Sequence, residues 1–288
     1  MSDATSFSVE VRPGLAMAAY RTQGGGATPV ICIPGLTRNA SDFDDFAPVA
    51  AATGRDVYAV SLIGRGRSAW DRDYLNYKPD TYRRDILAFM DRQKIARAIF
   101  VGTSLGGLVT ILTAAAAPER VAGAVINDIG PDLAPEGIAR IASYVGARAA
   151  GPDEPAHDLD EAARRIRAIN EPAFPGRDED FWRLFARRTF RQQADGRWML
   201  DYDPGIGKAL LEVGPAPDLW GPFAAMRTVP TLVVRGAISD LLTPPIIEKM
   251  RGAYPGFSYC EVAGVGHAPM LTEPDALAAI RPFLQALA

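Results

Sequence analysis

Short apolar runs alternate with helical stretches along most of this chain. Runs rich in β-branched residues predict strands, and stretches whose apolar residues recur every three or four positions predict helices. The expected strands cover residues 7–11, 15–21, 29–33, 56–62, 95–101, 121–127, 229–235 and 257–262. The expected helices cover residues 41–53, 80–93, 244–252 and 274–287, and a further helix follows the turn 102–107 and ends at 117. Apolar strands that alternate with helices indicate an α/β fold, with a mostly parallel sheet covered by helices on both faces.

Residues 132–217 depart from this alternation of strand and helix patterns. They contain helical stretches at 158–169 and 179–190, several prolines, and no convincing strand run. Prolines also stand at both edges of the segment, at Pro131 and at Pro217. We interpret it as a helical insertion between two strands of one core domain, which comprises residues 1–131 and 218–288.

Composition and charge exclude several classes of protein. The 288 residues are 48% hydrophobic, which is enough for a large core, and the formal net charge of -3 argues against a general nucleic-acid binder. The only two cysteines, Cys32 and Cys260, lie in apolar runs and indicate neither a disulfide framework nor a zinc site. No basic start leads into an apolar segment, and no apolar stretch is long enough to span a bilayer. We expect a soluble, cytoplasmic protein that binds neither nucleic acid nor membranes.

The strongest chemical signal is Gly102-x-Ser104-x-Gly106, which follows a predicted strand and precedes a predicted helix. A side chain on such a sharp strand-to-helix turn is held in a strained backbone conformation, and its neighbours two residues away must be small. The turn points Ser104 outward and places the amide of Leu105 at the positive end of a helix. The pattern therefore predicts a nucleophilic serine rather than a plain glycine-rich turn.

A serine hydroxyl needs a base, and the chain has only two histidines. His267 lies in a glycine-rich loop after the last predicted strand, where it can reach the edge of the sheet. His157 lies among Pro155, Asp158 and Asp160 in the insertion and is interpreted as a solvated surface residue. His267 is therefore the predicted base.

Two carboxylates compete for the role of orienting His267. Asp240 follows the strand 229–235, and Asp128 follows the strand 121–127. Both are expected at the carboxyl ends of strands, where ligands bind in such sheets. The chain order Ser, Asp, His suits either residue, but Asp240 stands in a loop that precedes a helix. We therefore favour Asp240 and keep Asp128 as the alternative.

These motifs resemble those of the α/β-hydrolases over nearly the whole chain. The resemblance rests on the turn at Ser104, on Gly236-x-x-Ser239-Asp240, on Gly266-His267, and on a Gly64-x-Gly66-x-Ser68 turn. It implies an eight-stranded sheet with residues 132–217 as a cap over the active site. It also implies an oxyanion hole made by the backbone amides of Leu36 and Leu105.

The loop before Leu36 departs from the family, because Pro34-Gly35 stands where many relatives have His-Gly. Arg38 and Asn39 follow closely and are candidate substrate contacts; Arg38 either binds a substrate carboxylate or only covers the loop. Trp182 is the third candidate contact. It belongs to an aromatic group that either forms the core of the cap or lines the pocket, together with Phe174, Phe181, Phe185 and Phe190.

The expected activity is hydrolysis of a carboxylic ester or lactone of small to medium size, without a metal or an organic cofactor. Serine at 104 argues against the branches of the family that use an aspartate nucleophile. Thr103 and Ala268 stand where carbon–carbon bond hydrolases of aromatic ring-cleavage products often have Asn and Trp, so that reaction ranks lower. A slow ligand receptor and a lyase on the same fold remain alternatives. We expect a monomer or a homodimer.

Overall fold

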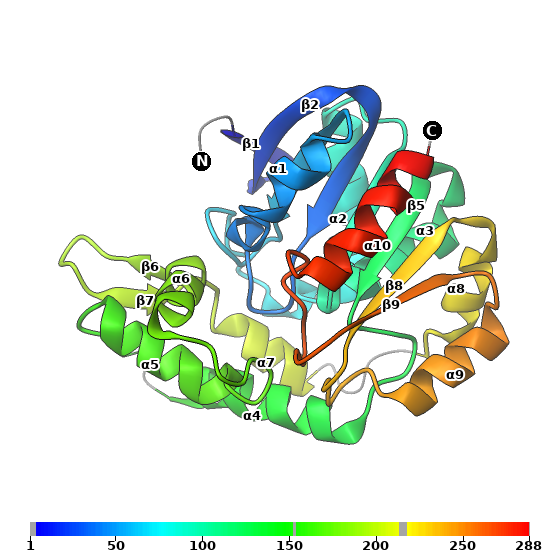
Figure 1. Cartoon of the computed structure of the whole chain (residues 1–288). Helices are drawn as coiled ribbons and strands as arrows, with labels where there is room; N and C mark the ends of the chain where they lie inside the picture. The colour runs from blue at the N-terminus through cyan, green and yellow to red at the C-terminus, as the bar shows by residue number, and fades with distance from the viewer. Residues whose placement is uncertain (1–3, 152–153, 213–217, 288) are drawn as a thin grey trace.

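A computed structural model describes residues 4–151, 154–212 and 218–287 and places one large sheet at the centre of the molecule (Figure 1). The sheet has seven strands in the order β1-β2-β4-β5-β8-β9, with β3 paired to β2. These strands are β1 (Ala4–Arg12), β2 (Leu15–Ile33), β3 (Arg55–Ser61), β4 (Ala98–Thr103), β5 (Val121–Asn127), β8 (Thr231–Gly236) and β9 (Ser258–Val262). Each pair from β2 to β9 along this order is parallel, whereas β1 is antiparallel to β2. The predicted mostly parallel sheet is therefore confirmed.

The strand β2 doubles back on itself, as the blue ribbon at the top of Figure 1 shows. Both of its arms pair with β3. In the first arm Ala18 pairs with Ser61, and in the second arm Val30 pairs with Val57. The bend contains Gly25, whose φ of +140° suits glycine. The sequence predicts two separate strands here, and the two arms account for the eight strands that the resemblance implies.

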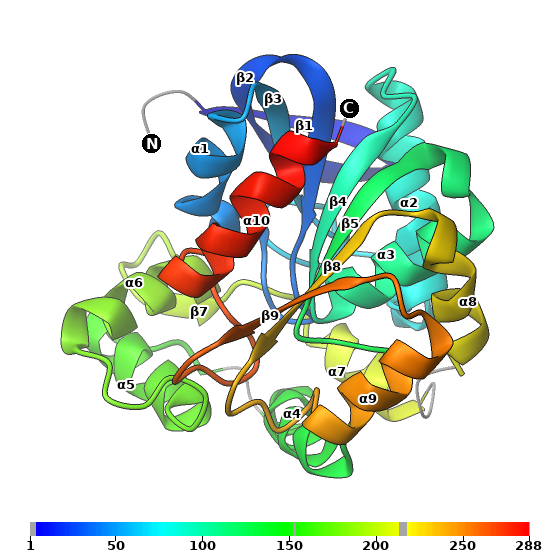
Figure 2. The same ribbon diagram turned by 45° about the vertical axis from the view of Figure 1, so that its right-hand side comes forward.

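Helices cover both faces of the sheet, as Figure 2 shows. One face packs against α2 (Pro79–Arg92), α3 (Leu105–Ala116), α8 (Trp220–Ala225) and α9 (Pro244–Ala253), and the other packs against α1 (Phe46–Ala51) and α10 (Pro274–Ala286). Alternate residues of a strand face opposite sides, so Ile31 and Ile33 of β2 join the first core whereas Val30 and Cys32 join the second.

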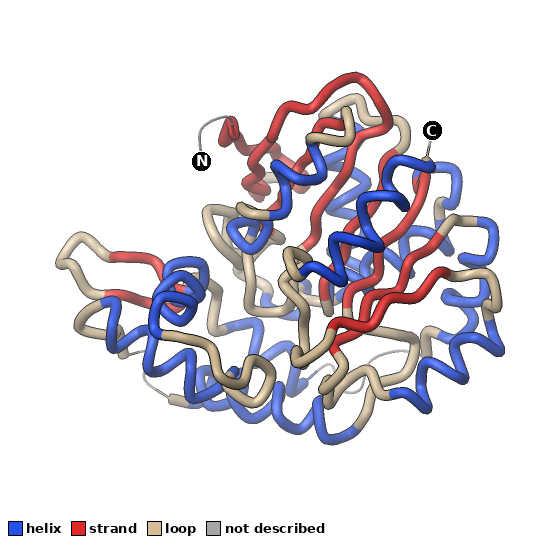
Figure 3. Tube along the Cα trace, in the orientation of Figure 1, coloured by secondary structure: helices blue, strands red, loops and turns tan. Residues whose placement is uncertain are grey.

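The insertion lies together below the sheet in the views of Figures 1 and 2. Its elements are α4 (Pro135–Ala150), α5 (Leu159–Asn170), α6 (Glu179–Thr189), β6 (Phe190–Gln192), β7 (Trp198–Leu200) and α7 (Gly205–Glu212). The predicted helices at 158–169 and 179–190 correspond to α5 and α6. The sequence shows no convincing strand run here, but β6 and β7 pair in a short hairpin (Figure 3). Strands of three residues are too short to show an alternating pattern.

The predicted boundary at 217/218 and the Pro-rich linker at Pro215 and Pro217 fall on residues 213–217, which lie outside the described part of the chain. The division into core and cap therefore stays an interpretation. Within the described residues, no helix is both long and apolar enough to cross a membrane.

Candidate active site

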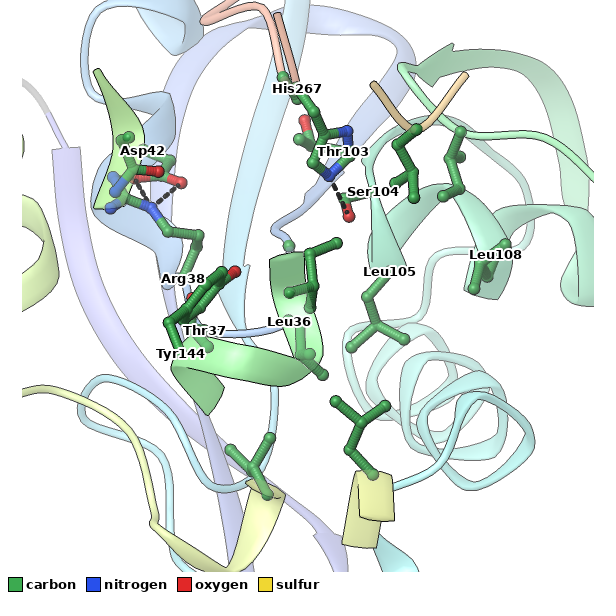
Figure 4. A pocket seen from close by; sticks show the side chains of 18 of the residues that line it. Leu36, Thr37, Arg38, Asp42, Thr103, Ser104, Leu105, Leu108, Tyr144 and His267 are labelled. Atoms are coloured by element: carbon green, nitrogen blue, oxygen red, sulfur yellow. Dashed lines mark hydrogen bonds and ion pairs between the residues drawn. The ribbon is translucent and has the colours of Figure 1, made fainter. Parts of the chain in front are cut away.

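Ser104 occupies the turn between β4 and α3, with φ of 53° and ψ of -118°. This left-handed conformation is unusual for a residue with a side chain and marks a strained turn. The Ser104 amide donates to the carbonyl oxygen of Asn127 over 2.9 Å, which fixes the turn to the end of β5. The side chain points into a cavity, where Figure 4 shows it beside His267.

The glycines around Ser104 are required by close packing. A Cβ atom on Gly102 would lie 2.3 Å from the carbonyl oxygen of Gly106, and one on Gly106 would lie 2.1 Å from the carbonyl oxygen of Ile33. A Cβ on Gly107 would lie 2.3 Å from Cγ2 of Ile129. Each of these distances is shorter than any real contact, so strand and helix can meet here only through glycine.

His267 stands between Ser104 and a buried carboxylate. Its Nε2 lies 2.9 Å from Ser104 Oγ, and its Nδ1 lies 2.8 Å from Asp128 Oδ2. An ionised carboxylate can only accept, so Nδ1 carries the proton and Nε2 is free to accept the serine proton. The loop that carries His267 is held by the Gly266 amide, which donates to the Ala173 carbonyl oxygen over 2.7 Å.

Asp128 is the carboxylate that meets His267. It is fully buried directly after β5, and its carboxylate accepts two further hydrogen bonds. The Gly236 amide donates to Oδ1 over 2.8 Å, and the Ser239 hydroxyl donates to Oδ2 over 2.6 Å. Three donors on one carboxylate compensate for its burial and fix its orientation toward His267.

Asp240 does not contact His267, so the expected position of Asp240 is wrong. Its carboxylate instead accepts from Arg140 Nε and Nη2, over 2.6 and 2.9 Å. The hydrogen bond from Arg140 is the main cause that lowers the pKa of Asp240. The physical reason is the course of the loop after β8, which turns Ser239 inward to Asp128 and leaves Asp240 paired with helix α4.

Leu36 and Leu105, the residues expected to form the oxyanion hole, both line the cavity next to Ser104. A Cβ on Gly35 would lie only 3.6 Å from Ser104 Cβ, so the loop before Leu36 reaches the nucleophile. The Gly35 carbonyl oxygen accepts from the Arg38 amide over 3.2 Å. In a trans peptide the carbonyl and the next N–H point in opposite directions, so this turn aims the Leu36 N–H away from Arg38.

The loop at Leu36 is anchored by Arg65, whose role the sequence did not reveal. Arg65 is fully buried in the Gly64-x-Gly66 turn, and its Nε donates to the Leu36 carbonyl oxygen over 2.8 Å. Its Nη1 donates to the Ile63 carbonyl oxygen over 2.8 Å and to the Tyr82 hydroxyl. The arginine thus supports the loop that lacks the histidine common in relatives.

Arg38 is the only one of the three weaker candidate contacts that lines the cavity within the described chain. Its Nε donates to Asp42 over 2.8 Å, its Nη1 donates to Thr189, and its guanidinium lies 4.0 Å from the centre of the Phe185 ring. Its position is therefore set by protein groups from the loop and from α6. These contacts favour the expectation that Arg38 covers the loop, and its role toward a substrate stays a prediction.

Asn39 and Trp182 do not lie among the described residues that line the cavity. Asn39 is buried, donates to the Arg188 carbonyl oxygen over 3.0 Å and accepts from the Ser41 amide over 2.9 Å, so it has a structural position at a helix start. Trp182 is 1% exposed and packs with the rings of Phe174 and Phe181. The aromatic group is expected either to form the core of the insertion or to line the pocket, and the contacts of Trp182 fit the core.

The cavity above Ser104 has a volume of about 440 Å³ and is mostly apolar. Residues of α4, α5, α6 and α7 close it from the side of the insertion, and the turns after β2, β4 and β9 close it from the side of the sheet. Among the described residues, no group of three or more His, Cys, Asp or Glu side chains could hold a metal ion.

Comparisons with known proteins show which family the sequence resembles. Residues 30–280 match the sequence profile of the alpha/beta hydrolase family. The chain is 32% identical to a 3-hydroxybutyrate-oligomer hydrolase of Cupriavidus necator, over 94% of this chain and 93% of the relative. It is 28% identical to an esterase of Mycobacterium tuberculosis, over 88% of this chain and 81% of that esterase.

A solved structure shows the same fold along the whole chain. An alpha/beta hydrolase from Novosphingobium aromaticivorans superposes with a TM-score of 0.90 at 36% sequence identity, and the match covers 99% of each chain. The profile match, the relative at 32% identity and this superposition all cover most of the chain. The chain belongs to the alpha/beta hydrolase family.

Proposed function

We propose that this hydrolase cleaves a carboxylic ester or lactone of small to medium size through an acyl-enzyme on Ser104. The observation that carries the proposal is the unbroken hydrogen-bonded line from Ser104 through His267 to Asp128, with distances of 2.9 and 2.8 Å, at the floor of an apolar cavity. Nucleophile, base and orienting acid in this geometry are the parts that acyl transfer needs.

The first half of the reaction forms the acyl-enzyme. Ser104 Oγ attacks the substrate carbonyl carbon while His267 Nε2 takes the hydroxyl proton. Asp128 stabilises the imidazolium that forms, and its bonds to Gly236 and Ser239 keep it in place. The imidazolium then donates its proton to the leaving oxygen as the bond from the carbonyl carbon to that oxygen breaks.

The oxyanion of each tetrahedral intermediate would be held by the Leu36 and Leu105 amides. Leu105 is the first residue of α3, so its amide adds the positive end of the helix dipole. Removal of one such donor in other hydrolases costs about 3 kcal/mol in the transition state. The anchoring of Leu36 by Arg65 supports this assignment.

The second half releases the product acid. A water molecule loses one proton to His267 and attacks the acyl carbon, and the tetrahedral intermediate collapses as His267 returns the proton to Ser104 Oγ. The products are the acid and the alcohol of the original ester, or one hydroxy acid when the substrate is a lactone. No step in this sequence needs a metal or an organic cofactor.

The relatives support an ester as the substrate. One is named as an esterase and another as a hydrolase of 3-hydroxybutyrate oligomers, whose units are joined by ester bonds. The mostly apolar cavity suits a carbon chain on one side of the scissile bond. Carbon–carbon bond hydrolysis on the same fold stays the second alternative. Ligand reception is an outcome that the following experiment separates.

The test is a time course with p-nitrophenyl butyrate on the wild type and on Ser104→Ala, followed by absorbance and by intact mass. Steady turnover in the wild type and its loss in the variant would support the proposal. A single rapid equivalent of nitrophenol with a lasting acyl mass would favour a receptor instead. Equal turnover in both proteins would refute the role of Ser104.

A further inference from the structure

The two sides of the cavity differ in polarity, as Figure 4 shows. Thr37, Arg38 and Tyr144 lie on one side of Ser104, whereas Leu105 and Leu108 lie on the other. An ester bond at Ser104 would therefore have one part of the substrate against hydrocarbon and the other part against polar groups. The polar side consequently determines which further functional groups a substrate can carry.

The positive charge of Arg38 on the polar side is already matched by a carboxylate. The Arg38 guanidinium is held by Asp42 through Nε, over 2.8 Å, and also through Nη2. Its Nη1 donates to Thr189. A substrate carboxylate at this place would meet Asp42 as well as Arg38, so the pair offers it little net attraction.

Two hydroxyls, those of Thr37 and Tyr144, stand beside this ion pair at the cavity wall. Burial is the main influence on the Tyr144 hydroxyl and raises its pKa, so it stays protonated and can donate. The Thr37 and Tyr144 hydroxyls hydrogen-bond to each other, and this bond uses the proton of only one of them. At least one of these O–H groups at the cavity wall therefore has no acceptor among the described residues.

A donor that faces an apolar cavity is stabilised when a ligand brings an acceptor to it. We propose that the Thr37 and Tyr144 hydroxyls form a subsite for a second, neutral oxygen of the substrate, either a hydroxyl or a carbonyl. The inference rests on the proposed function, since it concerns the same cavity. It names the substrate class as esters that carry a hydroxyl or carbonyl near the scissile bond, in preference to plain alkyl esters and to esters with a free carboxylate.

The test compares five esters by the acid they release at constant pH. Methyl butyrate and methyl 3-hydroxybutyrate differ by a hydroxyl in the acid part, and ethyl butyrate and 2-hydroxyethyl butyrate differ by one in the alcohol part. Monomethyl glutarate carries a carboxylate. One well-formed hydrogen bond changes kcat/KM by about tenfold. We expect a gain of about that size from the hydroxyl in at least one pair, and the slowest reaction from monomethyl glutarate.

The variants assign the preference to these hydroxyls. Tyr144→Phe and Thr37→Val should bring the ratio of kcat/KM between hydroxylated and plain ester close to one. Tyr74→Phe is the matched control, because the Tyr74 hydroxyl binds Glu212 at an exposed position outside the cavity. Its ratio should equal that of the wild type. Circular dichroism and the melting temperature verify that each variant folds.

The outcomes separate this inference from the proposed function. Hydrolysis that depends on Ser104 but shows no hydroxyl preference, or that is fastest with monomethyl glutarate, would overturn the subsite and leave the esterase intact. A hydroxyl preference that survives both cavity variants would also overturn it. Absence of Ser104-dependent hydrolysis of all five esters would contradict the proposed function and, with it, the subsite.

Discussion

Replacement of Asp128 by asparagine should nearly abolish turnover. Three donors converge on this carboxylate: the Gly236 amide on Oδ1, and the Ser239 hydroxyl and His267 Nδ1 on Oδ2. An amide has a single acceptor oxygen, so at least one of these donors would face the NH₂ group. We expect the NH₂ group to face Gly236, because this orientation loses one hydrogen bond and the opposite one loses two.

The magnitude follows from the lost charge. A neutral amide cannot stabilise the imidazolium that His267 becomes, and the same change in other serine enzymes lowers kcat by about 10⁴-fold. This factor corresponds to about 5 kcal/mol in the activation free energy. We expect a loss of this order for Asp128→Asn, with little change in KM, in assays with p-nitrophenyl butyrate.

Asp240→Asn is the matched control. Asp240 is bound to Arg140 at a partly exposed position, with 35% of its side chain accessible, so the pair contributes about 1 kcal/mol or less to stability. We expect kcat within about threefold of the wild type, since the change leaves the groups around His267 in place. Melting temperatures of both variants show whether each is folded. Equal losses, or a larger loss in Asp240→Asn, would refute the assignment of Asp128.

Two further predictions concern buried charges. Arg65→Lys should lower kcat about tenfold with KM unchanged, because a lysine cannot bind the Leu36 carbonyl, the Ile63 carbonyl and the Tyr82 hydroxyl together. Arg55→Lys is the control, since it changes a buried arginine bound to carbonyls far from the site, and it should keep the kcat of the wild type. Equal kcat in both variants would contradict the positioning role of Arg65. Burial raises the pKa of Asp85 to about 6 despite its ion pair with Arg12, so the folded chain binds this proton more tightly than the unfolded chain. The stability of the wild type relative to Asp85→Asn should therefore fall by about 3 kcal/mol as the pH rises from 3 to 7, with most of the change between 4 and 6. Urea unfolding across this range measures the difference, and a pH-independent difference would disprove the shift.

The contact between Ser104 and His267 could be predicted because glycines flank both residues. Gly102 and Gly106 are demanded by close backbone approach, and Gly266 is packed against Ala173 in the same way. The glycine positions that meet these packing constraints can be recognised in the sequence alone. The preference for Asp240 over Asp128 is wrong, because the two residues follow neighbouring strands and only the path of each loop decides which one points toward His267.

In the insertion, too, the sequence predicts features that depend on local residues but not those that depend on tertiary packing. Asp158 and Asp178 are the N-caps of α5 and α6, and their side chains accept from the Glu161 and Phe181 amides. The helices predicted at 158–169 and 179–190 therefore start close to the observed ones. The position of Trp182 inside the insertion depends on how α5 and α6 pack, and local periodicity cannot distinguish an internal core from a pocket wall. The polar side of the cavity likewise arises only when α4 approaches the loop after β2.

The measurement that tests the central claim most directly is titration of the protein with a fluorophosphonate that reacts with activated serines. The account predicts loss of esterase activity in proportion to one bound equivalent, with the added mass on the peptide that contains Ser104 and none on Ser104→Ala. His267→Ala should react far more slowly, because its serine lacks a base. Activity that survives full labelling, or an adduct on another residue, would contradict Ser104 as the nucleophile.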